Sequence, residues 1–245
     1  MIVSGGKSVY GASIGILMLE ARFPRIPGDM GHAATWPFPV RYKVVRGASP
    51  DRVVLHNAEG LLEPFIEAAQ VLVADGCDGI TTNCGFLSLF QEELAGSVGV
   101  PVAASSLMQA PLIEAMLPPG RRVGIITISA GTLSEAHLRS AGVDTDTPIV
   151  GTDGGEEFSR VILGNEAELD VEAARRDLVN AGRELMLDHP EVGAVLLECT
   201  NMMPYAADIA KEIGRPVFTM ESFVSWFQGA LAPRRYPLDQ APGGV

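Results

Sequence analysis

Three cysteines in 245 residues are too few and too unevenly spaced to form a disulfide framework. The sequence is also poor in positive charge, since 18 Lys and Arg stand against 30 Asp and Glu and give a formal net charge of −12. An acidic chain without a stripe of basic residues repels phosphate backbones, which argues against nucleic acid as a partner. No run approaches the roughly 18 consecutive apolar residues of a membrane-spanning helix. Because unpaired thiols are typical of reducing compartments, we expect a cytoplasmic protein with no membrane partner.

What the sequence does contain is a regular alternation of short apolar runs and longer segments of helical periodicity. Apolar residues make up 47% of the chain, enough to bury a sizeable core. The predicted strands are 13–19, 41–45, 79–82, 100–104, 122–127, 147–151, 193–198 and 216–219. The predicted helices include 61–74, 87–97, 131–141, 171–188, 204–213 and 222–231. Nearly continuous apolar strands between helices indicate parallel sheets covered on both faces, so the predicted fold class is α/β.

An internal repeat relates the two halves of the chain. The motif Thr82-Asn83-Cys84-Gly85 is followed, 17 residues after its cysteine, by Pro101-Val102. The motif Leu197-Glu198-Cys199-Thr200 is followed at the same distance by Pro216-Val217, an offset of 115 residues throughout. Each unit therefore reads as strand, cysteine, helix and strand, which indicates two structurally similar units.

The break between these units is predicted at Pro118-Pro119-Gly120, because two prolines and a glycine end a helical segment there. We predict a first α/β domain of residues 1–118 plus 219–245 that carries Cys84, and a second of residues 119–218 that carries Cys199. Both are expected to be Rossmann-like three-layer domains with parallel sheets, related by pseudo-two-fold symmetry. The active site is expected in the cleft between them, and residues 237–245 are expected to form a loose tail.

The two matched cysteines are the strongest candidates for chemistry. Cys84 and Cys199 each follow a predicted strand and enter a predicted helix, where free N–H groups favour the thiolate. Two thiols on opposite walls of a cleft suit a reaction in which one removes a proton from a carbon and the other returns one. Such an inversion requires neither a metal nor an organic cofactor, and the spacing lacks the pairs typical of zinc ligands. The third cysteine, Cys77, lies between two aspartates at the opposite end of its strand and is predicted to be structural.

An anionic substrate also requires hydrogen-bond donors around the pair. The candidates next to the cysteines or at neighbouring strand ends are Asn83, Gly85, Phe86, Thr200, Asn201, Ser105, Ser106, Thr127 and Ser129. Gly85 is expected to permit close approach of a ligand to the backbone, whereas each hydroxyl could equally be a helix cap. The loop after the first strand adds Arg22, Arg25 and His32, whose roles the sequence leaves open.

With these paired cysteine motifs and this layout, the sequence resembles the aspartate/glutamate/hydantoin racemase superfamily over essentially its whole length. The resemblance implies a site between two similar domains and cofactor-independent two-base inversion by Cys84 and Cys199. It also implies that Asn83, Gly85 and the Thr200-Asn201 pair hold the substrate carboxylate, and that the protein forms a homo-oligomer. We therefore expect an isomerase, a racemase or epimerase acting at a carbon α to a carboxylate or carbonyl.

The neighbours of the cysteines leave the substrate open. Gly85-Phe86 and Met202-Met203 suggest a less polar pocket than an amino-acid zwitterion prefers, so a hydantoin-like ring or another small acid is as plausible. Within the same superfamily, a maleate-isomerase-like cis–trans isomerase and an arylmalonate-type decarboxylase are alternatives. The alternative outside enzymes is a binding protein that closes on a small acid.

Overall fold

The computed structural model describes residues 2–7 and 9–236, so the predicted tail at 237–245 lies outside the described residues. The described chain forms two four-stranded sheets, with strand orders β2-β1-β3-β4 and β6-β5-β7-β8. The first sheet contains β1 (Ile14–Leu19), β2 (Val40–Val45), β3 (Gly79–Thr82) and β4 (Val102–Ala103). The second contains β5 (Arg122–Thr127), β6 (Ile149–Gly151), β7 (Val192–Leu197) and β8 (Val217–Phe218). Every strand pair is parallel, which confirms the α/β fold class and gives both sheets the same order.

Helices connect the strands, as parallel pairing requires. The α-helices are α1 (Pro50–Val54), α2 (Leu62–Ala74), α3 (Gln91–Ser97), α4 (Ala110–Met116), α5 (Glu135–Ser140), α6 (Phe158–Leu163), α7 (Val171–Asp188), α8 (Ala206–Ile213) and α9 (Met220–Leu231). Four 3-10 helices accompany them in the described chain, namely η1 (Ala33–Thr35), η2 (Gly85–Phe90), η3 (Ser106–Gln109) and η4 (Thr200–Tyr205). None of the helices in the described ranges combines the length and apolar character needed to cross a membrane.

The predicted elements differ from the observed ones mainly at helix starts. The helix predicted at 131–141 begins only at Glu135, because Ser134 caps it through the backbone and side chain of His137. The helices predicted at 87–97 and 204–213 are each preceded by a 3-10 segment, η2 and η4, that begins directly after a cysteine. The helices α1 and α6 were not predicted, since five or six residues are too few to show a helical period, whereas α4 is the helical segment expected to end before Pro118.

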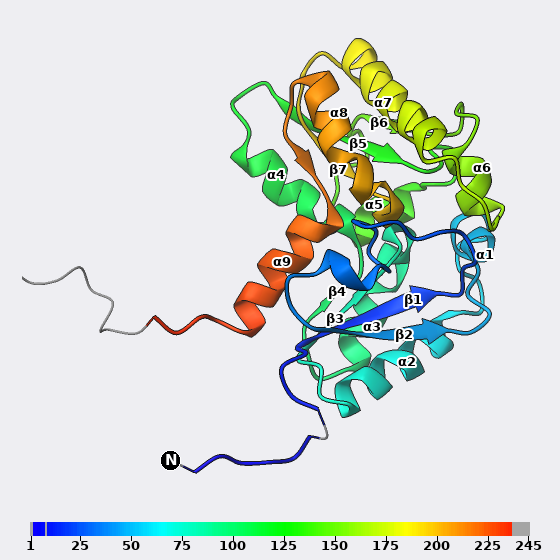
Figure 1. Cartoon of the computed structure of the whole chain (residues 1–245). Helices are drawn as coiled ribbons and strands as arrows, with labels where there is room; N and C mark the ends of the chain where they lie inside the picture. The colour runs from blue at the N-terminus through cyan, green and yellow to red at the C-terminus, as the bar shows by residue number, and fades with distance from the viewer. Residues whose placement is uncertain (1, 8, 237–245) are drawn as a thin grey trace, which may run out of the picture.

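The first sheet is covered on both faces. Residues of β1 alternate between the two sides, because successive side chains of a strand point to opposite faces. Leu17 packs with Phe65 and Leu72 of α2, whereas Ile16 packs in a separate cluster with Phe227 of α9. In Figure 1, α9 runs from the second sheet back to β4, and it contacts β3. The division of the chain into two domains at 118/119 and 218/219 stays a prediction.

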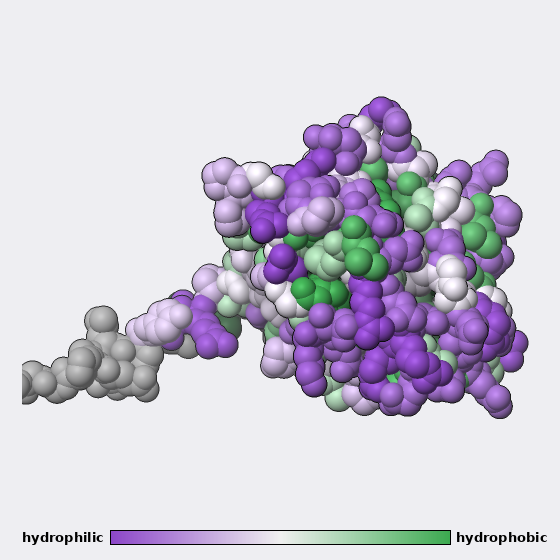
Figure 2. Space-filling view, turned by 90° about the horizontal axis from the view of Figure 1, so that it is seen from above, coloured by the Kyte–Doolittle hydropathy of each residue, from purple (hydrophilic) through white to green (hydrophobic). Residues whose placement is uncertain are grey.

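Hydrophilic side chains dominate the face seen in Figure 2, and apolar ones gather there only in patches. The apolar residues are concentrated inside, in the two buried clusters on the sheets.

Hydrogen bonds also join the two sheets at their carboxyl ends. Thr200 Oγ1 after β7 donates to the carbonyl of Asn83 after β3 at 2.6 Å, and Ser106 Oγ donates to the carbonyl of Glu198 at 2.7 Å. These contacts place the carboxyl ends of β3 and β7 against each other.

Candidate active site

The two matched cysteines occupy equivalent positions in the two sheets. Cys84 precedes η2 and Cys199 precedes η4, and both residues have extended backbone conformations that turn the chain from strand into helix. Each side chain is only 8% exposed, and both line a single cavity between the sheets. The structure therefore brings the two thiols to one site, as the internal repeat predicts.

The cavity is small and mostly apolar. Its apolar walls include Leu19, Phe23, Val54, Phe86, Ile128 and Ile162, and its polar lining consists of Asn83, Glu198 and Asn201 beside the thiols. The volume is about 20 Å³, roughly the space of one water molecule. Val54 and Ile162 come from α1 and α6, which contact each other and close one side of the site (Figure 1). A substrate enters only if these walls move apart.

Burial controls the state of the Cys84 thiol. It raises the pKa of Cys84 far above its ordinary value, and the nearby Glu198 carboxylate raises it further. The backbone N–H groups of Phe86 and Leu87 and the charge of Arg25 act in the opposite direction. The N–H groups at the helix start do favour the thiolate, as predicted, but their effect is smaller than that of burial. Desolvation outweighs the few N–H groups of a short 3-10 helix.

The Cys199 thiol has a still less favourable setting for negative charge. Burial raises its pKa first, followed by the charges of Glu198, Cys84 and Asp29, against a single backbone N–H from Asn201. Its Sγ also donates to Asn201 Oδ1 at 3.5 Å, so the resting proton has an acceptor. These differences favour Cys84 over Cys199 as the thiol that loses its proton more readily.

A buried glutamate that the sequence analysis did not single out lines the same cavity as the two thiols. Glu198 is 1% exposed, and its Oε2 accepts a hydrogen bond from Thr127 Oγ1 at 2.8 Å. The backbone N–H groups of Gly85, Phe86 and Ile128 also stabilise its carboxylate, but burial outweighs them and raises the pKa to about 7. The sequence signal for this residue is a carboxylate at the end of an apolar strand, directly before the cysteine.

The position of Glu198 also explains why residue 85 is a glycine. A Cβ at position 85 would lie 2.7 Å from the carbonyl oxygen of Glu198 and closer still to its Oε1. The expectation that Gly85 leaves space for a ligand is therefore corrected, because the group that approaches its backbone is the Glu198 side chain. This contact fixes the start of η2, and with it Cys84, against the end of β7.

Several predicted binding residues lie near the cavity without lining it. The hydroxyl of Thr127 bonds Glu198, that of Thr200 bonds the Asn83 carbonyl, and that of Ser105 accepts the N–H of Leu107 at 3.1 Å as the cap of η3. Of the remaining residues in this group, Gly85, Ser106 and Ser129 are buried and likewise absent from the cavity wall. The Ser105 hydroxyl is therefore a helix cap, and the hydroxyls of Thr127 and Thr200 bond other groups of the protein. Their role as substrate ligands stays a prediction.

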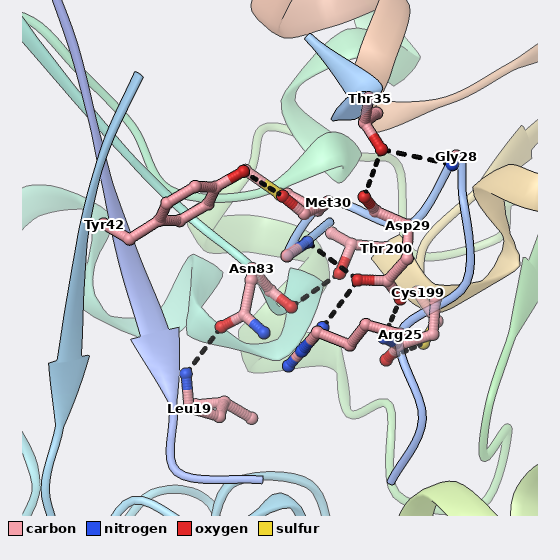
Figure 3. Close-up of polar contacts among 12 residues, drawn as sticks. Leu19, Arg25, Gly28, Asp29, Met30, Thr35, Tyr42, Asn83, Cys199 and Thr200 are labelled. Atoms are coloured by element: carbon pink, nitrogen blue, oxygen red, sulfur yellow. Dashed lines mark hydrogen bonds and ion pairs between the residues drawn. The ribbon is translucent and has the colours of Figure 1, made fainter. Parts of the chain in front are cut away.

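Three predicted binding residues do line the cavity, and neighbouring groups orient two of them. They are Asn83, Phe86 and Asn201. The amide oxygen of Asn83 accepts the N–H of Leu19 at 2.7 Å (Figure 3). The amide nitrogen of Asn201 donates to Asp29 Oδ2 at 2.7 Å. Among the described residues, the amide nitrogen of Asn83 donates no hydrogen bond, so its N–H groups are available to a ligand.

The loop after β1 contributes an ion pair beside the site. Arg25 Nη1 donates to Asp29 Oδ1 at 2.8 Å (Figure 3). The guanidinium lies over the ring of Phe23, 4.8 Å from its centroid. Its Nη2 atom is buried and has no hydrogen-bond partner among the described residues. The two other candidates in this loop do not line the cavity, since Arg22 is exposed and His32 caps η1 through its Nδ1.

Cys77 lies away from the cavity. It is buried before β3, and burial is the main cause that raises the pKa of its thiol to about 11, with the two flanking aspartates adding to it. No group of three or more His, Cys, Asp or Glu side chains within the described ranges is arranged to hold a metal ion.

No family model matches the chain. Solved structures with the same fold include arylmalonate decarboxylase, which is 15% identical with a TM-score of 0.55 and covers 90% of this chain and 92% of its own. A glutamate racemase from Bacillus anthracis is 16% identical with a TM-score of 0.58, covering 91% and 85%. An aspartate racemase from Picrophilus torridus is 14% identical with a TM-score of 0.53, covering 93% and 97%. The chain thus has the same fold as this decarboxylase and these racemases, which is the fold that the resemblance implies.

The sequence relatives are named for a different class of enzyme. A dimethylsulfoniopropionate lyase from Durusdinium sp. clade D is 29% identical over 219 residues, covering 84% of this chain and 71% of the relative. Dimethylsulfoniopropionate lyase 7 from Emiliania huxleyi is 26% identical over 238 residues, covering 89% and 67%. Lyase 6 from the same organism is 28% identical over 217 residues, covering 84% and 56%, so this chain spans only part of its relatives' length. Both comparisons support an enzyme, but the expected isomerase class is not confirmed, because these relatives are lyases.

Proposed function

We propose that this chain is a cysteine-dependent lyase that removes a proton α to a carboxylate and expels a sulfide from the β carbon. The substrate class is a small β-sulfonium acid such as dimethylsulfoniopropionate. The single observation that carries the proposal is the cavity shared by Cys84 and Cys199 in a chain whose relatives are lyases for this compound.

The proposed reaction is a β-elimination. Dimethylsulfoniopropionate carries a dimethylsulfonium group on the carbon β to its carboxylate. The cysteine thiol first loses its proton to solvent. The thiolate then takes a proton from the α carbon, the C–H electrons form the α–β double bond, and the C–S electrons leave with sulfur. The products are dimethyl sulfide and acrylate, and the proton remains on the cysteine until it passes to solvent. No external oxidant, reductant or water is consumed.

The arrangement of the site assigns a part to each residue. Cys84 is the proposed base, because backbone N–H groups and Arg25 oppose the effect of burial there more than at Cys199. Removing an α proton builds negative charge on the carboxylate, and preorganised donors lower that barrier. The free amide N–H groups of Asn83 on the cavity wall are the proposed donors.

Racemisation at the α carbon is the second candidate, and the presence of two thiols in one cavity favours it. Both reactions begin with the same proton transfer, so the substrate decides between them. A carbanion with a sulfonium on its β carbon expels sulfide, whereas one without a leaving group waits for a proton from the second cysteine. Cis–trans isomerisation, decarboxylation and simple binding of a small acid are the other outcomes that the assays below separate.

The decisive experiment measures dimethyl sulfide in the headspace above the full chain and dimethylsulfoniopropionate. Parallel samples in deuterium oxide follow α-carbon exchange by NMR for amino acids, hydantoins and substituted malonates. We expect sulfide release that falls by at least about 100-fold in Cys84→Ser, the usual size of a lost acid or base, whereas Cys199→Ser should lower α-carbon inversion more than sulfide release. Cys77→Ser is the matched control, because Cys77 lies outside the cavity. Exchange or inversion without sulfide would replace the lyase by a racemase, and full activity in Cys84→Ser would refute both.

A further inference from the structure

The ionisable side chains that line the cavity are all acidic. Among the lining residues, Glu198 carries the one carboxyl group, and none of the lining side chains within the described ranges is a lysine, arginine or histidine. A buried carboxylate is costly unless hydrogen bonds or an opposite charge stabilise it. The site therefore contains a negative group whose charge is not balanced by a cation on the wall.

Hydrogen bonds hold the carboxylate in place without neutralising it. Thr127 Oγ1 and the backbone N–H groups of Gly85, Phe86 and Ile128 are its donors. No lysine, arginine or histidine nitrogen of the described chain lies within 4.0 Å of it, and the nearby Arg25 is paired with Asp29 instead. The carboxylate is thus fixed by groups from both sheets and available to a cation that enters the cavity.

The walls around it suit a poorly hydrated cation. Phe23 and Phe86 supply aromatic surface, and aromatic rings attract onium groups through their electron-rich faces. The ring of Phe23 already carries the Arg25 guanidinium at 4.8 Å, so it serves as a cation site in this structure. A small onium group loses little hydration on entering such walls, unlike an ammonium with N–H donors to satisfy.

We propose that Glu198 is the specificity-determining residue that selects a cationic head group on the substrate. This inference rests on the proposed function for the identity of the head group, a sulfonium. It goes beyond that function because it assigns the charge preference to one side chain that also holds Cys84 in place through Gly85.

The preference must follow the ionisation of Glu198. The groups that face it are the thiols of Cys84, directly before η2, and Cys199, directly before η4. Both thiols have a pKa raised well above neutrality and are therefore uncharged. On α5, His137 packs on Phe86 with ring centroids 4.9 Å apart, and burial lowers its pKa to about 4, so it is uncharged as well. The Arg25–Asp29 pair in the loop after β1 is internally compensated. Between pH 5.5 and 8.5, Glu198 is therefore the group facing the cavity whose charge changes, and cation binding should strengthen as pH rises.

The test uses two probes of the same shape that do not undergo elimination. 3-(Trimethylammonio)propanoate carries a permanent cation and a poor leaving group, and 4,4-dimethylpentanoate is its neutral isostere. Calorimetry on the full chain is expected to show roughly 10- to 100-fold tighter binding of the cationic probe, the range typical of a partly desolvated charge pair. In Glu198→Gln this ratio should fall to about one, with the neutral probe binding as before.

Two control variants separate charge from structure. Thr127→Val removes one hydrogen bond to Glu198 but keeps its charge, so the ratio should persist. Glu114→Gln makes the same substitution at a glutamate that also accepts a backbone N–H, from Val123 at 2.7 Å, but lies outside this cavity. If Glu198→Gln does not fold, the ratio measured on the unaltered chain should still drop as pH falls from 8.5 to 5.5. A ratio that is constant with pH, or equal in Glu198→Gln, overturns the inference.

The outcomes also separate this inference from the proposed function. Sulfide release with an unchanged probe ratio in Glu198→Gln would keep the lyase and remove the role of Glu198. A Glu198-dependent ratio without sulfide release would keep the cation preference and remove the lyase.

Discussion

The contact between Gly85 and Glu198 makes a sharp prediction for Gly85→Ala. The added methyl group would lie 2.7 Å from the Glu198 carbonyl oxygen and closer to Oε1, so the start of η2 must move away from β7. Glu198 cannot yield easily, because it is buried and held by Thr127 and backbone donors. Overpacking of this kind typically costs about 1–3 kcal/mol, which for a chain of this size lowers Tm by roughly 2–12 °C.

The effect on activity should exceed the effect on stability. Cys84 immediately precedes η2, so a displacement of this helix moves one thiol relative to the other. A misplacement of about 1 Å is enough to lower a rate by about 100-fold. We expect Gly85→Ala to stay folded by circular dichroism, to unfold at a lower temperature, and to lose sulfide release mainly through kcat.

Gly96→Ala is the matched control, because a methyl group at Gly96 in α3 meets no atom within 4 Å. Alanine is favoured over glycine inside a helix by roughly 0.5–1 kcal/mol, so this variant should be as stable as the original chain or more stable. A Gly85→Ala protein with unchanged Tm and kcat would refute the view that Glu198 positions Cys84 through Gly85.

Three further predictions follow from the same contacts. Asp29→Asn removes the charge that pairs with Arg25 and weakens the hydrogen-bond acceptor for Asn201. The free energy of unfolding measured in urea should therefore fall by about 1–3 kcal/mol. An unchanged midpoint of the urea unfolding curve would contradict this prediction. The folded pKa of Glu198, about 7, lies above its unfolded value of 4.5, so its contribution to stability is lost as pH rises through 7. The free energy of unfolding of Glu198→Gln should therefore rise, relative to that of the original chain, by up to about 3 kcal/mol between pH 4.5 and 8. A difference in unfolding free energy that does not change with pH would count against this prediction. Ile162→Ala enlarges a cavity of about 20 Å³, so it should raise the ratio of kcat/KM for a diethyl sulfonium substrate to kcat/KM for the dimethyl substrate. An unchanged ratio would show that α6 does not limit the size of the substrate.

Much of the fold could be predicted because its signals are local. The strands β3 and β5 were predicted with their observed limits, since each is a short apolar run between a turn and a polar residue. The repeat at an offset of 115 residues also placed Cys84 and Cys199 at equivalent strand ends. The short helices α1 and α6 carry too little periodicity to be predicted, although they supply Val54 and Ile162 to the cavity wall.

The sequence by itself determined the α/β fold class and the pairing of two cysteines, because strand periodicity, turn residues and a repeated motif are all local in the chain. Only the tertiary structure decided what surrounds the thiols. The N–H groups at the start of η2 are a local feature and favour the Cys84 thiolate, but burial by residues from both sheets and the charge of Glu198 reverse the result. Glu198 itself stands next to Cys199 in sequence, yet its donors come from η2 and from the end of β5. Desolvation and charge depend on which distant segments meet, and that is set by packing.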